Sequence, residues 1–260
     1  KEDFLVEKIH KVVMWATKDI NGVSFSDIEM NANLSLYDGI SSVEIHKILI
    51  KSANDLISTS NPNYQYVAAR LLNMELRKEV WGCGDSPVDF LVFLERNVDN
   101  GVYDSLILDR WSEEEVELFA KCINHDRDDL FTYAGLQQLI DKYLVKNRST
   151  GNIYETPQLA YMCIAMCLFE TVEEVKKAYE CYSTFKINLP TPIMAGVRTN
   201  IRQFASCVLV DIDDNLDAIF SSIHAVGKYT ARRAGIGLNI GRMRPINSPI
   251  RGGEVIHTGL

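Results

Sequence analysis

The residues best suited to chemistry in this sequence lie near its end, in a basic and glycine-rich stretch. Arg244, Ser248, Arg251, Gly252 and Gly253 fall within ten residues of one another. Arginine side chains fork onto phosphate oxygens, and glycines let backbone N–H groups approach an anion closely. The stretch therefore suits a phosphate-bearing ligand, although a solvated basic loop explains the same composition.

Three further candidates lie upstream. Thr191 stands between two prolines, so we expect a stiff, extended backbone whose hydroxyl holds a phosphate or caps a turn. Cys207 lies in the apolar run 204–210; an inert core thiol is the simplest interpretation, and a redox role needs a second cysteine nearby. The His-Asp-Arg-Asp segment 125–128 could orient a general base, but a surface network of ion pairs is the simpler interpretation.

The glycines and cysteines give weaker signals. Gly235, Gly237 and Gly241 are not a dinucleotide fingerprint, because the last glycine is one residue late; close backbone packing in a barrel or sheet explains them equally well. The six cysteines show no CxxC pair and no Cys/His ligand spacing, so no metal site is predicted. Cys163 and Cys167 share a helix face within an apolar run and are expected to be buried thiols.

Composition limits the classes of protein to consider. The 260 residues have a net charge of −8, with 47% hydrophobic and 24% charged residues, which is typical of a soluble globular protein. An acidic chain without a long apolar run argues against nucleic-acid and membrane partners. Residues 211–217 hold four aspartates and no base, whereas residues 226–254 hold six bases and one acid. Such a local basic stretch suits a small anion, such as a nucleotide, better than a polymer.

The ends of the sequence and its cysteines indicate whether the chain is complete and which compartment it occupies. The chain begins at Lys1 and stops at Leu260, directly after a glycine-rich run, so we expect it to be a piece of something longer. Without a secretory signal pattern, we expect reduced cysteines and a cytoplasmic location.

The elements that must position these residues fall into three zones. Residues 1–82 are expected to be helical after a short extended start, with Ser41 or Ser42 capping one helix and another over 64–79. Residues 83–188 continue as helices, with an N-terminal signature at 112–115 and helices over 131–143 and 156–169. Between the last two, residues 145–154 predict a hairpin around a Thr-Gly-Asn turn.

The third zone, residues 189–260, changes character. Residues 204–210 predict a buried strand, residues 216–233 a helix, and residues 235–240 a second strand. The order strand, helix, strand indicates a parallel α/β unit.

Specific motifs then identify a family. The segments LPTPIMAGVRT (189–199), RQFASC (202–207), RAGIGLN (233–239) and SPIRGG (248–253) together resemble the large, catalytic subunit of class I ribonucleoside-diphosphate reductase. YDGI (37–40) and YQYVAAR (64–70) resemble its N-terminal regulatory domain, the ATP-cone; HDRD (125–128) and KYLVKNR (142–148) resemble its helical region. The resemblance spans the chain but covers only the N-terminal part of the family's protein.

The resemblance implies a fold and a reaction. The fold would be an ATP-cone over residues 1–82, a helical domain over 83–200 and, over 201–260, the first strands of a ten-stranded α/β barrel with the specificity site. The reaction is the radical-based reduction of ribonucleoside diphosphates to deoxyribonucleotides. Cys207 matches the first-strand cysteine of a pair that supplies two electrons and becomes a disulfide. The substrate-binding positions would be Thr191, Ser206, Ala234 and Gly235.

The resemblance also implies two regulatory sites. The first binds the specificity effector, a deoxynucleoside triphosphate or ATP, through Asp214, Asn215, Leu216, Arg244, Ile250 and Arg251. The second binds ATP or dATP in the cone through Glu2, Asp3, Phe4, Leu5, Val6, Glu7, Lys8, Ser42, His46 and Lys78. Two positions depart from the family pattern: Asn215 replaces an expected serine, and Glu75 stands where a second pocket histidine is common. An acid facing a triphosphate is unfavourable, so we expect altered dATP inhibition.

The family works with partners. These would be a small radical-generating subunit with its metal or radical cofactor, a second large subunit, thioredoxin or glutaredoxin as dithiol reductant, and the C-terminal remainder of the large subunit. The radical-bearing cysteine and the second redox cysteine lie in that remainder, so we expect the 260 residues alone to be inactive. The competing hypothesis is a non-catalytic nucleotide-sensing module, but Cys207 and the barrel-entry motifs have no purpose in a pure sensor.

Overall fold

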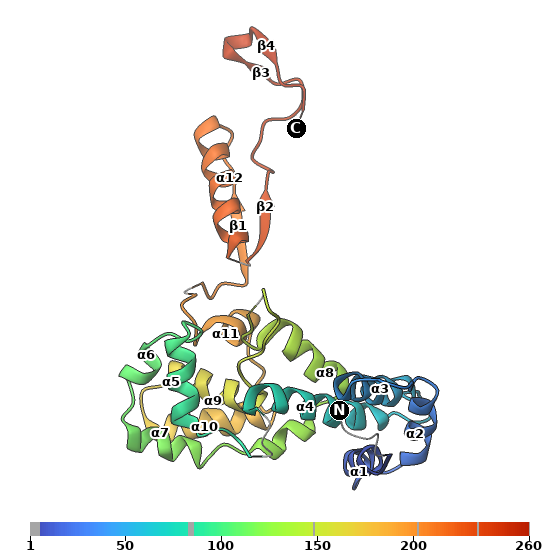
Figure 1. The fold of residues 1–260 in the computed structure, drawn as a ribbon. Coiled ribbons are helices and arrows are strands. Elements are labelled where there is room, and N and C mark those ends of the chain that lie inside the picture. The colour runs from blue at the N-terminus through green and yellow to red at the C-terminus, as the bar shows by residue number, and fades with distance from the viewer. Residues whose placement is uncertain (1–5, 83–85, 148, 202, 233, 260) are drawn as a thin grey trace. The chain divides into compact units, whose positions relative to one another are not determined.

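The computed structural model describes residues 6–82, 86–147, 149–201, 203–232 and 234–259. The chain divides into two compact units: Lys1–Leu189 with Ile193–Asn200, and Pro190–Pro192 with Ile201–Leu260 (Figure 1). The predicted positions Glu2, Asp3, Phe4 and Leu5 lie outside the described residues. The subdivision of the first unit after residue 82 stays a prediction.

Four helices begin the first unit. They are α1 (Val6–Thr17), α2 (Phe25–Asn33), α3 (Ser42–Asp55) and α4 (Tyr64–Trp81). Ser41, one of the two predicted caps, begins α3: its hydroxyl accepts a hydrogen bond from Glu44 N, and the Glu44 carboxylate accepts one from Ser41 N. This reciprocal pair satisfies two backbone N–H groups that the first turn leaves unpaired. α4 packs against both α3 and α1 through buried residues such as Val67, Ala68 and Leu71.

The helical region that follows contains the predicted elements with one irregularity. It runs through α5 (Phe90–Asp99), α6 (Leu106–Asp109), α7 (Glu113–Ala120), the 3₁₀ helix η1 (His125–Leu130), α8 (Tyr133–Gln138), η2 (Leu139–Tyr143), α9 (Pro157–Leu168), α10 (Val172–Ser183) and α11 (Thr191–Gly196). Ser112 caps α7 in a reciprocal pair with Glu115, as its sequence signature predicts. The predicted helix over 131–143 is α-helical only as far as Gln138 and then widens into the π-helix η2.

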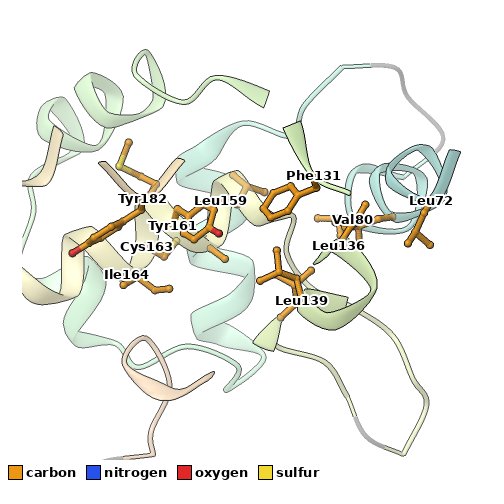
Figure 2. Close-up of a cluster of buried hydrophobic side chains, with 14 of the residues drawn as sticks. Leu72, Val80, Phe131, Leu136, Leu139, Leu159, Tyr161, Cys163, Ile164 and Tyr182 are labelled. Atoms are coloured by element: carbon orange, nitrogen blue, oxygen red, sulfur yellow. The ribbon is translucent and has the colours of Figure 1, made fainter. Parts of the chain in front are cut away.

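The core of the first unit forms around α9. Its residues from Pro157 to Met166 are all buried, so no face of this stretch is open to solvent. Figure 2 shows Leu159, Tyr161 and Ile164 of α9 in a cluster that also contains Phe131 and Leu136, with Leu72 and Val80 of α4 beside Leu136. Cys163 is fully buried and Cys167 is partly buried, which confirms the core interpretation for the first thiol.

The predicted hairpin at 145–154 is present as a short antiparallel pairing. Lys146 and Ile153 form a β-bridge, Tyr154 N donates to Val145 O at 3.0 Å, and Gly151 takes a positive φ of 84° in the turn. A glycine suits that left-handed conformation because it has no Cβ.

The second unit contains the predicted strand–helix–strand. β1 (Cys207–Asp211) and β2 (Gly235–Asn239) pair in parallel, joined by α12 (Leu216–Ala231). A short antiparallel pair follows, β3 (Pro249–Ile250) and β4 (Val255–Ile256), with the 3₁₀ turn η3 (Arg251–Gly253) between them.

The expectation of a buried strand over 204–210 is wrong in two respects. The strand begins at Cys207, because the Gln203 side chain both accepts from Ala205 N and donates to Ala205 O, which bends the chain before the ladder starts. The strand is also uncovered, with Leu209 89% exposed. Among the described residues only β2 and α12 pack on β1, and they cannot cover both faces of a strand.

Candidate functional site

The two parallel strands bring together four of the predicted substrate-site residues. Cys207 and Gly235 are register partners at the start of β1 and β2. Gly235 N donates a 2.8 Å hydrogen bond to Ser206 O, so Ser206, Cys207, Ala234 and Gly235 lie at the same end of the sheet. Cys207 and Gly235 are 28 positions apart in the sequence, so spacing alone could not identify them as neighbours; the parallel pairing brings them together.

The thiol of Cys207 is exposed, which overturns the interpretation of an inert core cysteine. Like Cys122, Cys163 and Cys181, Cys207 carries a free thiol. On the neighbouring strand, a Cβ at Gly237 would lie 2.8 Å from Leu209 Cδ2, closer than side chains allow. Gly237 therefore allows the two strands to pack closely, which favours the packing explanation of the glycines over a nucleotide-binding motif.

Thr191 differs from its predicted conformation. It is the exposed first residue of α11 rather than part of an extended loop. Proline is tolerated at the next position because the first helical turn leaves its N–H groups without intrahelical partners. Its contact with a substrate phosphate stays a prediction.

Four of the predicted effector residues lie close together after the carboxyl end of β1. Arg244 Nε donates to Asp214 Oδ2 at 2.7 Å, and both side chains are about one-third exposed, 34% and 33%. Asn215 caps α12 by accepting a hydrogen bond from Ala218 N at 2.8 Å, and Leu216 is the first residue of that helix. An asparagine caps a helix as well as the expected serine does.

The other two effector positions, Ile250 and Arg251, lie in the β3–β4 hairpin. Arg251 has a positive φ of 52°, followed by Gly252 at 68° and Gly253 at 98°. Glycine adopts this left-handed backbone without strain, which accounts for the glycines at 252 and 253 in the turn. An effector contact at Ile250 and Arg251 stays a prediction.

Sequence reasoning missed Arg242, which pairs with two carboxylates. Its guanidinium lies 2.7 Å from Asp211 Oδ2 and 2.9 Å from Asp213 Oδ1. The hydrogen bond that Arg242 donates to Asp213 and the charges of Asp211 and Asp213 raise the pKa of Arg242. The signal was present in the sequence: an acidic run and a basic run of opposite sign, which the fold places side by side.

The predicted activity site lies on the first unit, across α1, α3 and α4. Val6, Glu7 and Lys8 form the exposed first turn of α1, and Ser42 is the exposed first residue of α3. One turn after Ser42, His46 is buried with Nε2 2.7 Å from Leu71 O.

The charge environment of His46 identifies its neighbours on α4. Burial lowers the pKa of His46, the hydrogen bond to Leu71 O opposes that shift, Lys78 lowers the pKa further and Glu75 raises it. These influences place His46, Glu75 and Lys78 close together, so α3 and α4 assemble three of the side chains expected around the effector.

The segment 125–128 is only in part the surface ion-pair network that its sequence suggests, because Arg127 pairs with Glu180 near the surface but Asp128 lies in the core. Asp128 is fully buried and accepts a 3.0 Å hydrogen bond from Gln158 Nε2, while Arg77 of α4 lies 3.5 Å away. Burial raises the pKa of Asp128 to about 7, an effect that Arg77 and Gln158 oppose. Hydrophobic periodicity could not reveal this, because Gln158 is 30 positions and Arg77 is 51 positions away in the sequence.

The described residues contain neither a metal-binding cluster nor a membrane-spanning helix. No three His, Cys, Asp or Glu side chains in that part of the chain converge in an arrangement that could hold a metal ion. Within the same residues, no helix has the length and apolar character needed to cross a membrane.

Comparison with protein families gives three matches along the chain. The ATP cone domain matches residues 1–79, the ribonucleotide reductase all-alpha domain matches 129–202, and the ribonucleotide reductase barrel domain matches 205–260. These matches and the cone-like helices, helical core and parallel strand pair define a class: the chain belongs to the ribonucleotide reductase family.

Similarity to individual proteins places it within that family. The chain is 47% identical over 262 residues to ribonucleoside-diphosphate reductase 1 subunit alpha of Escherichia coli (strain K12), covering 98% of this chain and 34% of the relative. It is 46% identical over 270 residues to the subunit alpha of Haemophilus influenzae and 44% over 266 residues to that of Enterobacteria phage T4, covering 100% of this chain and 35% of each. The chain thus corresponds to the N-terminal region of an alpha subunit and spans about a third of its relatives' length.

Proposed function

We propose that this chain is the regulatory and barrel-entry portion of the catalytic subunit of a class I ribonucleoside-diphosphate reductase. The complete enzyme reduces ribonucleoside diphosphates to deoxyribonucleoside diphosphates and operates in the cytoplasm. The observation that carries the proposal is the exposed thiol of Cys207 in register with Gly235, beside Ser206 and Ala234. The thiol is exposed, and two of the residues at the same end of the sheet, Ala234 and Gly235, are small.

The proposed reaction needs this thiol as half of a reductant. Removal of the 2′-hydroxyl as water takes two electrons, which a dithiol supplies as it becomes a disulfide. Cys207 provides one of the two sulfurs, and the cysteine that completes the pair belongs to the C-terminal remainder. Thioredoxin or glutaredoxin returns the disulfide to the dithiol. The radical that starts the reaction comes from the small subunit and its cofactor, and two large subunits assemble with it.

Two effector sites complete the proposal. Arg244 and Arg251 bind effector phosphates, and Asp214, Asn215, Leu216 and Ile250 line the remainder of the specificity site. Val6, Glu7, Lys8, Ser42, His46 and Lys78, with residues 2–5, bind ATP or dATP in the cone. The guanidinium of Arg244 forms an ion pair with Asp214. An effector triphosphate must therefore either bind Arg244 beside that carboxylate or displace the carboxylate from it.

The test has two arms. The 260 residues, mixed with a radical-generating small subunit, CDP and dithiothreitol, are expected to give no turnover. A chimera in which they replace the matching region of the Escherichia coli relative is expected to reduce CDP with thioredoxin. Cys207→Ser in the chimera is expected to lower thioredoxin-dependent turnover by more than about a thousandfold, as for a residue of the reacting machinery.

Cys181→Ser, on α10, serves as the matched control and is expected to retain turnover. Equal activity of the Cys207→Ser and unaltered chimeras would refute the assignment of the redox thiol. An inactive chimera that still binds ATP and dATP through the cone would favour the alternative, a non-catalytic nucleotide-sensing module, for which the ATP cone match is the specific support.

A further inference from the structure

Two adjacent faces of helix α4 contact two different neighbours. Leu71, Glu75 and Lys78 lie at spacings of four and three residues and face His46 of α3. The second face consists of side chains at spacings of three and four residues, and side chains so spaced form a single stripe along a helix. That stripe contains Arg70, Asn73, Arg77 and Trp81.

Arg77 is the centre of the second face. Its Nη2 donates a hydrogen bond to His125 O and lies 3.5 Å from Asp128 Oδ2. The guanidinium also stands 5.1 Å from the ring centroid of Trp81, and that ring meets the His125 ring edge to face at 5.1 Å. Arg77, on the helix that bears Glu75 and Lys78, therefore contacts η1 directly at His125 and Asp128 and indirectly through the Trp81 ring.

Arg70 connects the same interface to the first helix. Its Nη1 donates to Lys18 O at 2.6 Å and to Ala16 O at 3.3 Å, and its Nε lies 3.5 Å from Asp129 Oδ2. The end of α1, which begins with the predicted nucleotide contacts, is thus linked to η1 through one guanidinium.

The opposite side of η1 is bonded into the helical core. Asp128 accepts a hydrogen bond from the side-chain amide of Gln158 on α9 at 3.0 Å. The Oε1 atom of the same side chain accepts one from the Tyr179 hydroxyl on α10 at 2.9 Å. Arg127 pairs with Glu180 of α10 at 2.7 Å. η1 consequently bridges the cone helix α4 and the two helices that form the centre of the unit.

The α4–η1 interface is buried but incompletely hydrogen-bonded. Arg77 Nε, Trp81 Nε1, His125 Nδ1 and Asp128 Oδ2 are buried and have no hydrogen-bond partner among the described residues. Unpaired buried polar groups cost free energy, so an interface that contains several is held less firmly than an apolar one and can exchange partners. Such an interface can adopt a second arrangement at small cost, which is what coupling between distant sites requires.

We infer that the α4–η1 interface transmits nucleotide binding in the cone to the helical domain, with Arg77 and Asp128 as its positioning residues. The inference rests on the proposed activity site. Arg77 is adjacent to Lys78 on an unbroken helix, so a shift of α4 that closes Lys78 onto a triphosphate displaces Arg77 as well. The displacement changes how Arg77 divides its contacts between His125 O and Asp128.

The experiment is hydrogen exchange measured by mass spectrometry on the 260-residue chain, alone and saturated with ATP or with dATP. Binding is measured in parallel by calorimetry. Protection of amides in 124–131 is expected to change at least threefold on nucleotide binding. In Asp128→Asn the nucleotide should still bind, with its dissociation constant changed by more than about threefold, and the exchange response of 124–131 should be lost.

Glu180→Gln is the matched control, because it removes a charge paired with η1 on the side away from α4; its exchange response should equal that of the unaltered chain. Circular dichroism verifies the fold of each variant, and Arg77→Lys replaces Asp128→Asn if the latter does not fold. Nucleotide binding with unchanged exchange in 124–131 would overturn the inference alone. Failure of the unaltered chain to bind either nucleotide would overturn the activity site and the inference with it.

Discussion

Glu155 and Arg198 form an ion pair in which both side chains are fully buried. Arg198 Nε donates to Glu155 Oε2 at 2.7 Å, its Nη1 donates to Met194 O at 2.7 Å, and Glu155 Oε1 accepts from Val145 N at 2.6 Å. Burial alone would lower the pKa of Arg198, but the charge and hydrogen bonds of Glu155 raise it overall. The pair thereby joins the end of α11 to the start of the hairpin at residue 145.

Removing one member of this pair should be strongly destabilising. We expect Glu155→Gln to lower the free energy of unfolding by about 3–5 kcal/mol, because Arg198 is left as an uncompensated buried charge. Urea denaturation followed by circular dichroism measures the change. Glu117→Gln, which breaks an exposed i,i+4 pair with Lys121, should cost about 0.5 kcal/mol or less. Similar losses in the two variants would contradict the role of burial.

Asp128 should make stability depend on pH. Burial raises its pKa to about 7 in the folded chain, above the 3.8 of an ordinary aspartate. The folded state then holds a proton that the unfolded state has released, so this group's contribution is complete below about pH 4 and is lost as pH rises to about 7. His125, whose pKa burial lowers to about 4, acts in the opposite direction between about 4 and 6.5.

The difference between the unaltered chain and Asp128→Asn isolates the Asp128 contribution. We expect the free energy of unfolding of the unaltered chain, relative to the variant, to fall as pH rises from about 4 to 7. Denaturation curves at half-unit intervals of pH measure it. A difference that is flat across this window would show that Asp128 has an ordinary pKa.

Glu75 should weaken dATP binding. At an effective dielectric constant of about 20, a carboxylate several ångströms from a triphosphate costs about 1–2 kcal/mol. Glu75→His is therefore expected to tighten dATP binding by about tenfold in calorimetry, whereas Asp55→Asn at the exposed end of α3 should leave it unchanged. Full inhibition of the reassembled enzyme by micromolar dATP with Glu75 in place would contradict this expectation.

The cap at Asn215 should tolerate serine but not alanine. Asn215→Ala removes the acceptor for Ala218 N and should destabilise the first turn of α12 by about 1 kcal/mol, whereas Asn215→Ser should be nearly neutral. Hydrogen exchange of the Ala218 amide is expected to accelerate about fivefold in the alanine variant only. Equal exchange in the two variants would mean that the side chain does not cap the helix in solution.

The cysteines should differ in reactivity. Cys207 is exposed, whereas Cys163 is fully buried and burial raises the pKa of its thiol well above the usual value. Thiolates are the reactive species, so iodoacetamide should label Cys207 at least about a hundredfold faster than Cys163. Peptide mass spectrometry over time gives both rates. Labelling of Cys163 at a comparable rate would indicate that the core opens readily.

Local signals in the sequence predicted much of the fold. Capping patterns located the starts of α3 and α7, and an apolar run located α9, because those structures depend on neighbouring residues. The register of Cys207 with Gly235, the Arg242 ion pairs and the burial of Asp128 depend on residues brought together by tertiary folding. The exposure of Leu209 was missed for another reason: an apolar run predicts a strand that suits burial, but it does not show which elements cover that strand.

The packing of α4 against two groups of helices affects whether the first four helices can be lost as one unit. α4 contributes Val67 and Leu71 to the packing of the first four helices, yet it also packs on α8, where Val80 lies beside Leu136 of the helical region (Figure 2). A deletion that removed residues 1–82 would therefore leave an apolar surface on α8 open to water. Loss of the cone from such a chain in evolution would require compensating polar substitutions around Leu136 and Phe131, or retention of α4 after the other three helices had gone.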